Sequence, residues 1–213
     1  MSLTLHSYWR SSAAWRVRIA LALKGVTYSQ ITHDLRSDQQ RDPEFLALNP
    51  QGLVPALETG GVVLTQSMAM IEWLEETFPH PALLPQDALS RAHVRAMAQV
   101  IACDIHPLNN LRVLQSLRTD LAAEEASVSA WIARWITAGF TTLEAMVRRF
   151  GKGFAFGDTP GLVDCCLIPQ LFSARRFDVD LTAFPRLIAV EARCASMPTF
   201  LNAAPATQPD AAR

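Results

Sequence analysis

The sequence predicts a small α/β domain followed by an all-helical domain. Strand-like and helix-like patterns alternate over the first part of the chain, and the strand patterns disappear beyond it. The intervening stretch is rich in proline, with Pro79, Pro81 and Pro85, as is typical of a linker. We therefore place the first domain at residues 1–82 and the second at residues 88–213.

The first domain is expected to follow the order β-α-β-α-β-β-α. A strand-like segment, Leu3–Tyr8, runs into an amphipathic helical pattern at Ala14–Lys24, which Gly25 is well placed to end. The Gly60-Gly61 pair predicts the turn of a hairpin. The remaining expected elements are strands at Thr27–Thr32, Pro55–Glu58 and Val62–Thr65, and helices at Asp42–Ala47 and Ser67–Thr77.

The second domain is expected to consist of long amphipathic helices. These lie at Arg91–Asn110, Ser127–Phe150, Leu162–Arg176 and Phe184–Met197. Trp131, Trp135 and Phe140 follow helical spacing, so we expect them in the core.

The composition of the chain argues against several classes of protein. Half of the 213 residues are hydrophobic and the net charge is −1, which gives no reason to expect a nucleic-acid or anionic membrane partner. No apolar run is long enough to span a membrane, and no signal-peptide pattern is evident. The four cysteines form no CxxC motif, which indicates reduced thiols in a cytoplasmic protein and no metal site.

Two expected helix starts can hold an anion. Ser11 and Ser12 stand where the first helix begins, beside Arg10, and the N–H groups there attract a phosphate, carboxylate or thiolate. Ser67 follows Gln66 and is the predicted N-cap of another helix, with no acidic residue at the next two positions. Simple helix capping is the alternative for all three serines.

The dipeptide Val54-Pro55 follows a loop and opens a strand. A cis bond there would turn the backbone N–H and C=O groups of Val54 outward, ready to pair with a peptide-like ligand. Only about 5% of X–Pro bonds are cis, so an ordinary trans bond at a strand start is the alternative.

Several separated motifs resemble the zeta class of glutathione transferases. Residues 10–21 read Arg-Ser-Ser-Ala-Ala-Trp-Arg-Val-Arg-Ile-Ala-Leu, which is similar to the class signature Ser-Ser-Cys-x-Trp-Arg-Val-Arg-Ile-Ala-Leu. The pairs Asn49-Pro50, Val54-Pro55, Gln66-Ser67 and Ile71-Glu72 match the glutathione-site motifs of the superfamily. The resemblance continues through Leu83–Pro85, Asp104–Asn110, Gly157–Asp164 and Gln170–Thr182, so it spans nearly the whole chain.

The resemblance implies a thioredoxin-like first domain, an all-α second domain and glutathione as cosubstrate. It also implies a cis Pro55, with Val54 pairing through its backbone with the cysteinyl part of glutathione. Gln66 and Ser67 would hold the γ-glutamyl end, and Gln40 matches a position that contacts the glycine end.

The sulfur of glutathione would face Ser11 and Ser12. We expect Ser11 to stabilise the thiolate, with Ser12 as the alternative. Ala13 replaces the cysteine of the class, so the reacting sulfur is expected to come from glutathione and not from the protein. The resemblance also assigns Asp164 to a helix-capping box, with Gly161 in place of the usual Thr or Ser.

Members of the zeta class isomerise maleylacetoacetate or maleylpyruvate, so a glutathione-dependent cis–trans isomerase of aromatic catabolism is implied. Thiolate addition, bond rotation and thiolate expulsion would give the fumaryl isomer, and arginines suit the two substrate carboxylates. Arg10, Arg112 and Arg176 are the candidates, and Arg10 is also a candidate for catalysis. His106 and Asn110 could contact glutathione or substrate, and the segment around His106 slightly favours maleylpyruvate.

Two other functions stay open. The first is a general glutathione transferase that conjugates or dehalogenates small electrophiles. The second is a non-catalytic glutathione-binding protein, whose case depends on Ala13. The resemblance further implies a homodimer with its active site near the subunit interface.

Overall fold

The computed structural model describes residues 2–211, which form two compact units. Unit 1 comprises Met1–Leu83 with Ala195–Arg213, and unit 2 comprises Leu84–Cys194. This division differs from the expected one, in which residues 88–213 formed one domain. The carboxyl-terminal segment joins unit 1 because its helix α9 (Pro198–Ala203) packs against α1 (Ser12–Lys24).

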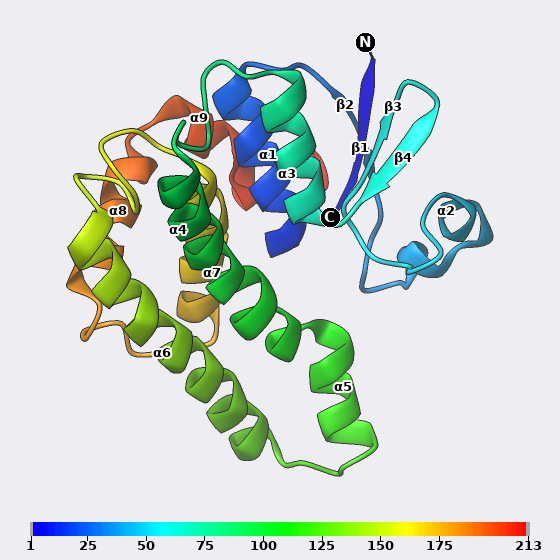
Figure 1. Ribbon diagram of the computed structural model, residues 1–213. Helices are drawn as coiled ribbons and strands as arrows, with labels where there is room; N and C mark the ends of the chain where they lie inside the picture. Colours follow the sequence, from blue (N-terminus) through cyan, green and yellow to red (C-terminus); the bar gives the residue numbers. More distant parts are fainter. Residues whose placement is uncertain (1, 212–213) are drawn as a thin grey trace. The chain divides into compact units, whose positions relative to one another are not determined.

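Unit 1 contains a four-stranded sheet in the order β2-β1-β3-β4 (Figure 1). The central strand β1 pairs parallel with β2 and antiparallel with β3, and β3 pairs antiparallel with β4. Together with three helices, these strands confirm the predicted order and the thioredoxin-like fold. Their bounds are β1 Leu3–Ser7, β2 Ser29–Thr32, α2 Pro43–Leu48, β3 Ala56–Thr59, β4 Val62–Thr65 and α3 Ser67–Thr77.

Helix α1 is the buried centre of unit 1. It ends at Gly25, as predicted, and Gly25 has the left-handed φ of 65° that glycine adopts without strain. The expected amphipathic character is wrong, because residues 14–21 are buried on every side, including Arg16 and Arg18. Helices α3 and α9 both pack against α1, so no face of this stretch is left for water.

Unit 2 is helical, as predicted. The expected Ser127–Phe150 and Leu162–Arg176 helices are present, but the expected Arg91–Asn110 helix is divided, and a further helix follows it. The bounds are α4 Ala88–Gln99, a π-helical segment Val100–Ile105, a 3₁₀ turn Pro107–Asn109, α5 Leu111–Thr119, α6 Glu125–Phe150, α7 Leu162–Arg176 and α8 Pro185–Ala195.

The division of the expected helix has two local causes. The His106 N–H bonds to the Ile101 carbonyl at 2.9 Å, five residues back, and Pro107 has no N–H to continue the helix. The π-helical segment also approaches α6 closely at Gly139, where an added Cβ would lie 2.3 Å from Ile105 Cδ1. Glycine at position 139 therefore permits this packing.

The aromatic residues of α6 are only partly in the core. Phe140 is fully buried, as expected, whereas Trp131 and Trp135 are half-buried. The Trp131 indole N–H donates to the Leu108 carbonyl at 2.9 Å. This polar end keeps Trp131 at the edge of the core.

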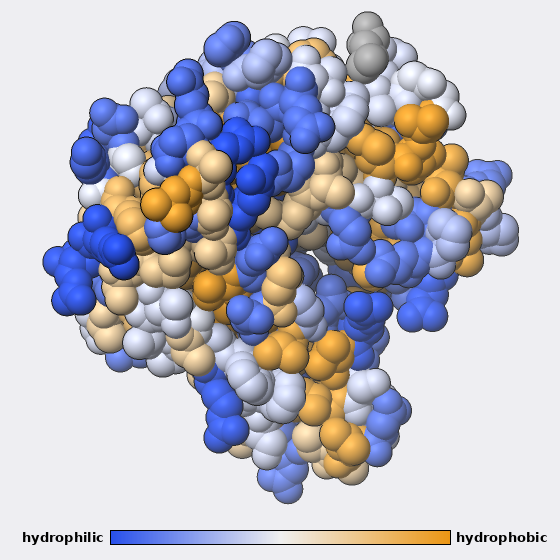
Figure 2. All heavy atoms as spheres, viewed as in Figure 1, coloured by the Kyte–Doolittle hydropathy of each residue, from blue (hydrophilic) through white to orange (hydrophobic). Residues whose placement is uncertain are grey.

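Figure 2 shows hydrophilic residues over much of the displayed face, with apolar residues gathered over the β3–β4 hairpin and over α5. Val62 and Leu111 are exposed apolar side chains of these elements. Among the described residues, no helix is both long and apolar enough to cross a membrane.

Asp164 fixes the start of α7, as expected. One carboxylate oxygen accepts from the Gly161 N–H and the other from the Ala155 N–H, each at 2.9 Å. Burial raises the pKa of this carboxyl to about 6, although the two hydrogen bonds oppose the shift. Asp164 thus closes the loop before α7 onto the helix.

We expect Asp164→Asn to lower the free energy of unfolding by about 1–3 kcal/mol, because one buried N–H loses its acceptor. The raised pKa means that the carboxyl stabilises the fold fully below about pH 4 and loses this contribution as the pH rises through 6. The substitution should therefore cost more at pH 4 than at pH 7, measured by urea unfolding of both proteins. An equal cost at the two pH values would contradict this account.

Candidate functional site

The loop between β1 and α1 presents Ser11 and Ser12 at a helix N-terminus. Ser11 is the N-cap, and its Oγ accepts from the Ala14 N–H at 3.2 Å. The hydroxyl proton of Ser11 is thereby left to donate to an external acceptor. The first turn of α1 contains no acidic residue, so the helix N-terminus favours an anion there.

Arg10 lies directly before this helix start and is half-buried. Its guanidinium is over the Trp9 ring, 5.2 Å from the ring centroid. No carboxylate within residues 2–211 forms an ion pair with Arg10. The Trp9 ring therefore orients a cation that can still bind an anion.

The start of α3 corrects one prediction. The N-cap is Gln66 and not Ser67, which is the first helical residue. The Gln66 side chain makes no capping hydrogen bond and the first turn of α3 has no acidic residue, so this helix start favours an anion. Gln66 has a φ of 68°, a strained value for a non-glycine residue, and backbone strain of this kind clusters at functional sites.

Arg16 is a component of this site that the sequence reasoning missed. It is 2% exposed, and its Nη1 donates to Ser67 Oγ at 3.4 Å. The guanidinium thus brings a positive charge behind the start of α3 and links that helix to α1. The signal in the sequence was a pair of arginines, Arg16 and Arg18, inside an otherwise apolar helix.

The Val54–Pro55 bond is cis, as the resemblance implied. Val54 precedes β3, so its backbone is outside the ladder of that strand. Asn49 holds the preceding loop, because its amide donates to the Leu53 carbonyl at 2.7 Å and accepts from the Gln51 N–H at 3.2 Å.

One side-chain hydrogen bond joins this loop to the start of α3. The Gln66 amide donates to Gln51 Oε1 at 2.8 Å. Unit 1 therefore brings the loop that leads to Val54 and the start of α3 together.

Gln40 is the buried residue of a 3₁₀ turn, Gln39–Arg41. Its Nε2 donates to Asp38 Oδ1 at 2.9 Å, and its Oε1 has no hydrogen-bond partner among the described residues. A buried amide oxygen without a partner is costly, which makes Gln40 a candidate to accept a hydrogen bond from a ligand.

Unit 2 carries the other predicted residues. His106 is half-buried at the end of the π-helical segment, a local irregularity that is frequent at functional sites. Asn110 is the N-cap of α5, and its Oδ1 accepts from the Arg112 N–H at 3.2 Å. Arg112 and Arg176 are exposed, and the Arg176 guanidinium lies 4.9 Å from the centroid of the Phe177 ring.

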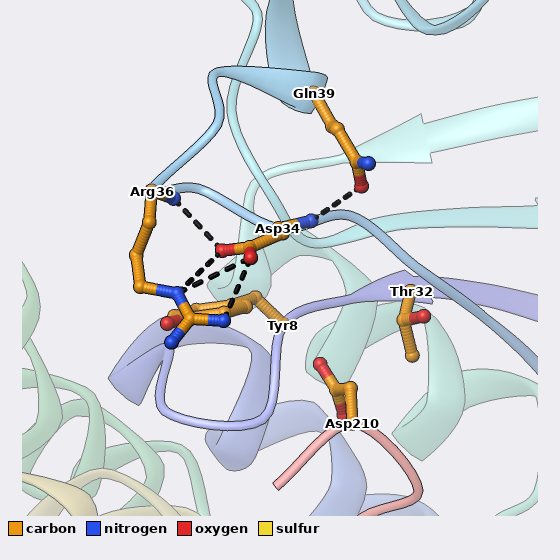
Figure 3. A pocket seen from close by; sticks show the side chains of 6 residues that line it. All are labelled: Tyr8, Thr32, Asp34, Arg36, Gln39 and Asp210. Carbon is orange, nitrogen blue, oxygen red and sulfur yellow. Dashed lines mark hydrogen bonds and ion pairs between the residues drawn. The ribbon is translucent and has the colours of Figure 1, made fainter. Parts of the chain in front are cut away.

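A separate pocket of about 220 Å³ opens at the end of β1 and β2. None of the predicted site residues lines it. Its lining is Tyr8, Thr32, Asp34, Arg36, Gln39 and Asp210 (Figure 3). Hydrogen bonds from Arg36 hold the pKa of Asp34 at about 2, so these two residues neutralise each other. Within residues 2–211, no group of three or more His, Cys, Asp or Glu residues could hold a metal.

Both parts of the chain match glutathione S-transferase domains. Residues 10–77 match the glutathione S-transferase N-terminal domain, and residues 129–193 match the C-terminal domain. The maleylpyruvate isomerase of Ralstonia sp is 52% identical over 98% of this chain and 99% of its own length. The maleylacetoacetate isomerase of Pseudomonas aeruginosa is 47% identical over 97% of each.

Solved structures of similar proteins agree with these sequence matches. A bacterial maleyl pyruvate isomerase, described as a zeta-class glutathione transferase, superposes with a TM-score of 0.95 at 52% identity, covering 97% of this chain and 99% of that one. The maleylacetoacetate isomerase of Anaeromyxobacter dehalogenans 2CP-1, with glutathione in its active site, gives 0.89 at 44% identity, covering 99% and 98%. The same enzyme with dicarboxyethyl glutathione and citrate gives 0.88 at 43% identity, covering 99% and 97%. This chain belongs to the glutathione S-transferase family.

Proposed function

We propose that this protein is a glutathione-dependent cis–trans isomerase that converts a maleyl diketo acid into its fumaryl isomer. The observation that carries the proposal is the pair of helix starts in unit 1, at Ser11 and at Gln66, neither of which has an acidic residue in its first turn. Relatives that match nearly the whole chain are named maleylpyruvate and maleylacetoacetate isomerases. The substrate is therefore a small dicarboxylate.

The residues of unit 1 fit glutathione. The open start of α3, with Gln66, Ser67 and the charge of Arg16 behind it, suits the γ-glutamyl carboxylate. The backbone of Val54 is placed to pair with the cysteinyl residue. The unpartnered Oε1 of Gln40 suits an amide N–H near the glycine end.

When bound, glutathione supplies a thiolate whose reversible addition to the cis double bond permits rotation about that bond. The Ser11 hydroxyl donates a hydrogen bond to the sulfur, and the N-terminus of α1 adds a favourable dipole. Both interactions favour the charged sulfur and lower its pKa. Ser12 is the alternative donor, and Ala13 offers no thiol of its own.

Arginines bind the carboxylates of the substrate. Arg10 is the first candidate because it directly precedes the sulfur site and is already oriented by Trp9. Arg112 and Arg176 in unit 2 are the others, and both guanidinium groups are on exposed residues. His106 and Asn110 complete the proposed binding residues.

We propose maleylpyruvate as the substrate in preference to maleylacetoacetate, because the segment around His106 resembles that of maleylpyruvate isomerases.

We also propose that the protein is cytoplasmic and forms a homodimer. Its four cysteines are free thiols, which suits a reducing compartment. Ile31 on β2 and Val62 on β4 are exposed apolar residues on the two edge strands, where burial against a second subunit would stabilise them.

The direct test follows the ultraviolet absorbance of maleylpyruvate and of maleylacetoacetate, with and without glutathione. We expect turnover of at least one substrate, and only when glutathione is present. The fumaryl product should be identified by chromatography. Turnover of neither substrate, together with fast conjugation of a chlorinated electrophile, would show a general transferase instead.

Ser11→Ala should raise the pKa of the bound glutathione thiol and lower kcat by about tenfold to a hundredfold, because a donor to the charged sulfur is lost. Loss of the helix cap contributes about 1 kcal/mol of instability in this variant, and only a few tenths in Ser11→Gly. The two variants should therefore lose activity alike and differ in thermal stability. A larger loss of activity in Ser12→Ala than in Ser11→Ala would assign the role to Ser12.

Arg10→Ala should raise KM for the maleyl substrate or lower kcat, giving a loss in kcat/KM of about tenfold to a hundredfold, because a charge-assisted bond to a carboxylate is removed. Glutathione affinity, measured by calorimetry, should change little. Arg134→Ala, which removes an exposed arginine of α6, serves as the control. Unchanged kinetics in Arg10→Ala would remove Arg10 from the mechanism.

A further inference from the structure

The loop that carries Arg10 and Ser11 is held by groups outside the proposed site. Trp9 is the residue before Arg10, and both of its backbone polar groups are bonded. Its N–H donates to Asp210 Oδ2 at 2.9 Å, and its carbonyl accepts from Arg18 Nη2 at 2.9 Å. The position of the Trp9 peptide therefore depends on two charged side chains, one nine residues away in the sequence and the other 201 residues away.

Arg18 connects this loop to the carboxyl-terminal segment, residues 195–211. Its Nε donates to the Ala203 carbonyl at 3.0 Å, and its Nη1 donates to Ser7 Oγ at 3.0 Å and to the Tyr8 carbonyl at 3.3 Å. The Tyr8 carbonyl also accepts from the Ser11 N–H at 3.0 Å. Arg18 thus reaches the peptide groups that set the turn before α1.

The carboxyl-terminal segment is itself folded so that Asp210 meets Trp9. The Thr207 hydroxyl is 2.8 Å from the Ala204 carbonyl and 3.0 Å from the Asn202 carbonyl. The Gln208 amide donates to the Ala204 carbonyl at 2.9 Å. These bonds turn the chain back after α9 and bring Asp210 to the loop before α1, where it contacts Trp9.

Asp210 is 9% exposed and lies at the wall of the pocket beside Tyr8 and Thr32 (Figure 3). Asp34 and Arg36, on another part of the wall, are bonded to each other. Asp210 instead accepts a charge-assisted hydrogen bond from the Trp9 N–H through its Oδ2.

We infer that Asp210 is a positioning residue for the reaction, and that the carboxyl-terminal segment sets the placement of Ser11 and Arg10 through it. This inference rests on the proposed roles of those two residues. The Asp210–Trp9 bond keeps the Ser11 hydroxyl directed at the sulfur and the Arg10 guanidinium directed at a substrate carboxylate. Displacement of the loop by a fraction of an ångström would weaken both interactions.

The test compares Asp210→Ala with Asp210→Asn. The Ala variant loses the acceptor for the Trp9 N–H, whereas the Asn variant keeps an amide oxygen that can accept the same bond. We expect Asp210→Ala to raise the pKa of the bound glutathione thiol, followed by thiolate absorbance, and to lower kcat about tenfold. Asp210→Asn should restore most of both properties.

Asp87→Ala is the matched control, because Asp87 also accepts from a backbone N–H, that of Ser90 at the start of α4, at 2.8 Å. It should reduce thermal stability and leave the thiol pKa and kcat unchanged. Thr207→Val loosens the carboxyl-terminal turn without touching Trp9, so it should act in the same direction as Asp210→Ala. It also keeps the inference testable if Asp210→Ala does not fold.

A normal thiol pKa and kcat in both Asp210→Ala and Thr207→Val would overturn the inference, as would an Asn variant as impaired as the Ala variant. Failure of the proposed function would give a different result. If the unmodified protein has no isomerase activity, the proposed reaction is rejected, but the pKa of the bound glutathione thiol still reports the position of the loop. A thiol pKa unaffected by Ser11→Ala would reject the role of Ser11.

Discussion

Unit 1 depends on the buried guanidinium of Arg18. This residue is 0% exposed, and burial lowers its pKa to about 10, so it still carries its charge at neutral pH. Removing a charge from water is unfavourable unless hydrogen bonds compensate for the lost hydration. Each of the three guanidinium nitrogens of Arg18 donates, and their acceptors are three backbone carbonyls and one hydroxyl, drawn from β1, the loop before α1 and the end of α9. The requirement to satisfy one cation therefore fixes where three segments of unit 1 meet.

The same helix contributes the groups that would favour an anion at the proposed site. Ser11 and Ser12 lie at the N-terminus of α1, and Arg16, one turn later, contacts Ser67 at the start of α3. Neither helix has an acidic residue in its first turn, so no carboxylate of these turns competes with a bound anion. A ligand with a carboxylate at one end and an ionisable thiol farther along fits this arrangement. Family membership and the electrostatics of unit 1 thus indicate the same cosubstrate.

Local signals in the sequence identified the elements that local chemistry determines. Gly25 ends α1 and Asp164 starts α7 as predicted, because capping involves only neighbouring residues. The N-cap at Gln66 was missed because its strained backbone is held by Gln51, on a different loop. The π-helical segment depends on close packing against Gly139, and the return of the chain to unit 1 depends on an Arg18–Ala203 contact across 185 residues. Contacts of this range leave no periodic pattern in the sequence.

The division of unit 1 between the two ends of the chain affects its synthesis on the ribosome. Residues up to Leu83 emerge first, but the Ala203 carbonyl and Asp210 are translated only after the whole of unit 2. Until then the nascent sheet and α1 would bury Arg18 without one of its acceptors, and the face of α1 that receives α9 would stay uncovered. Unit 2 can complete its own contacts earlier, since its sequence is continuous. The order of translation thus favours the helical unit as the first to reach its final packing, because unit 1 is completed only after α9 and Asp210 have been translated.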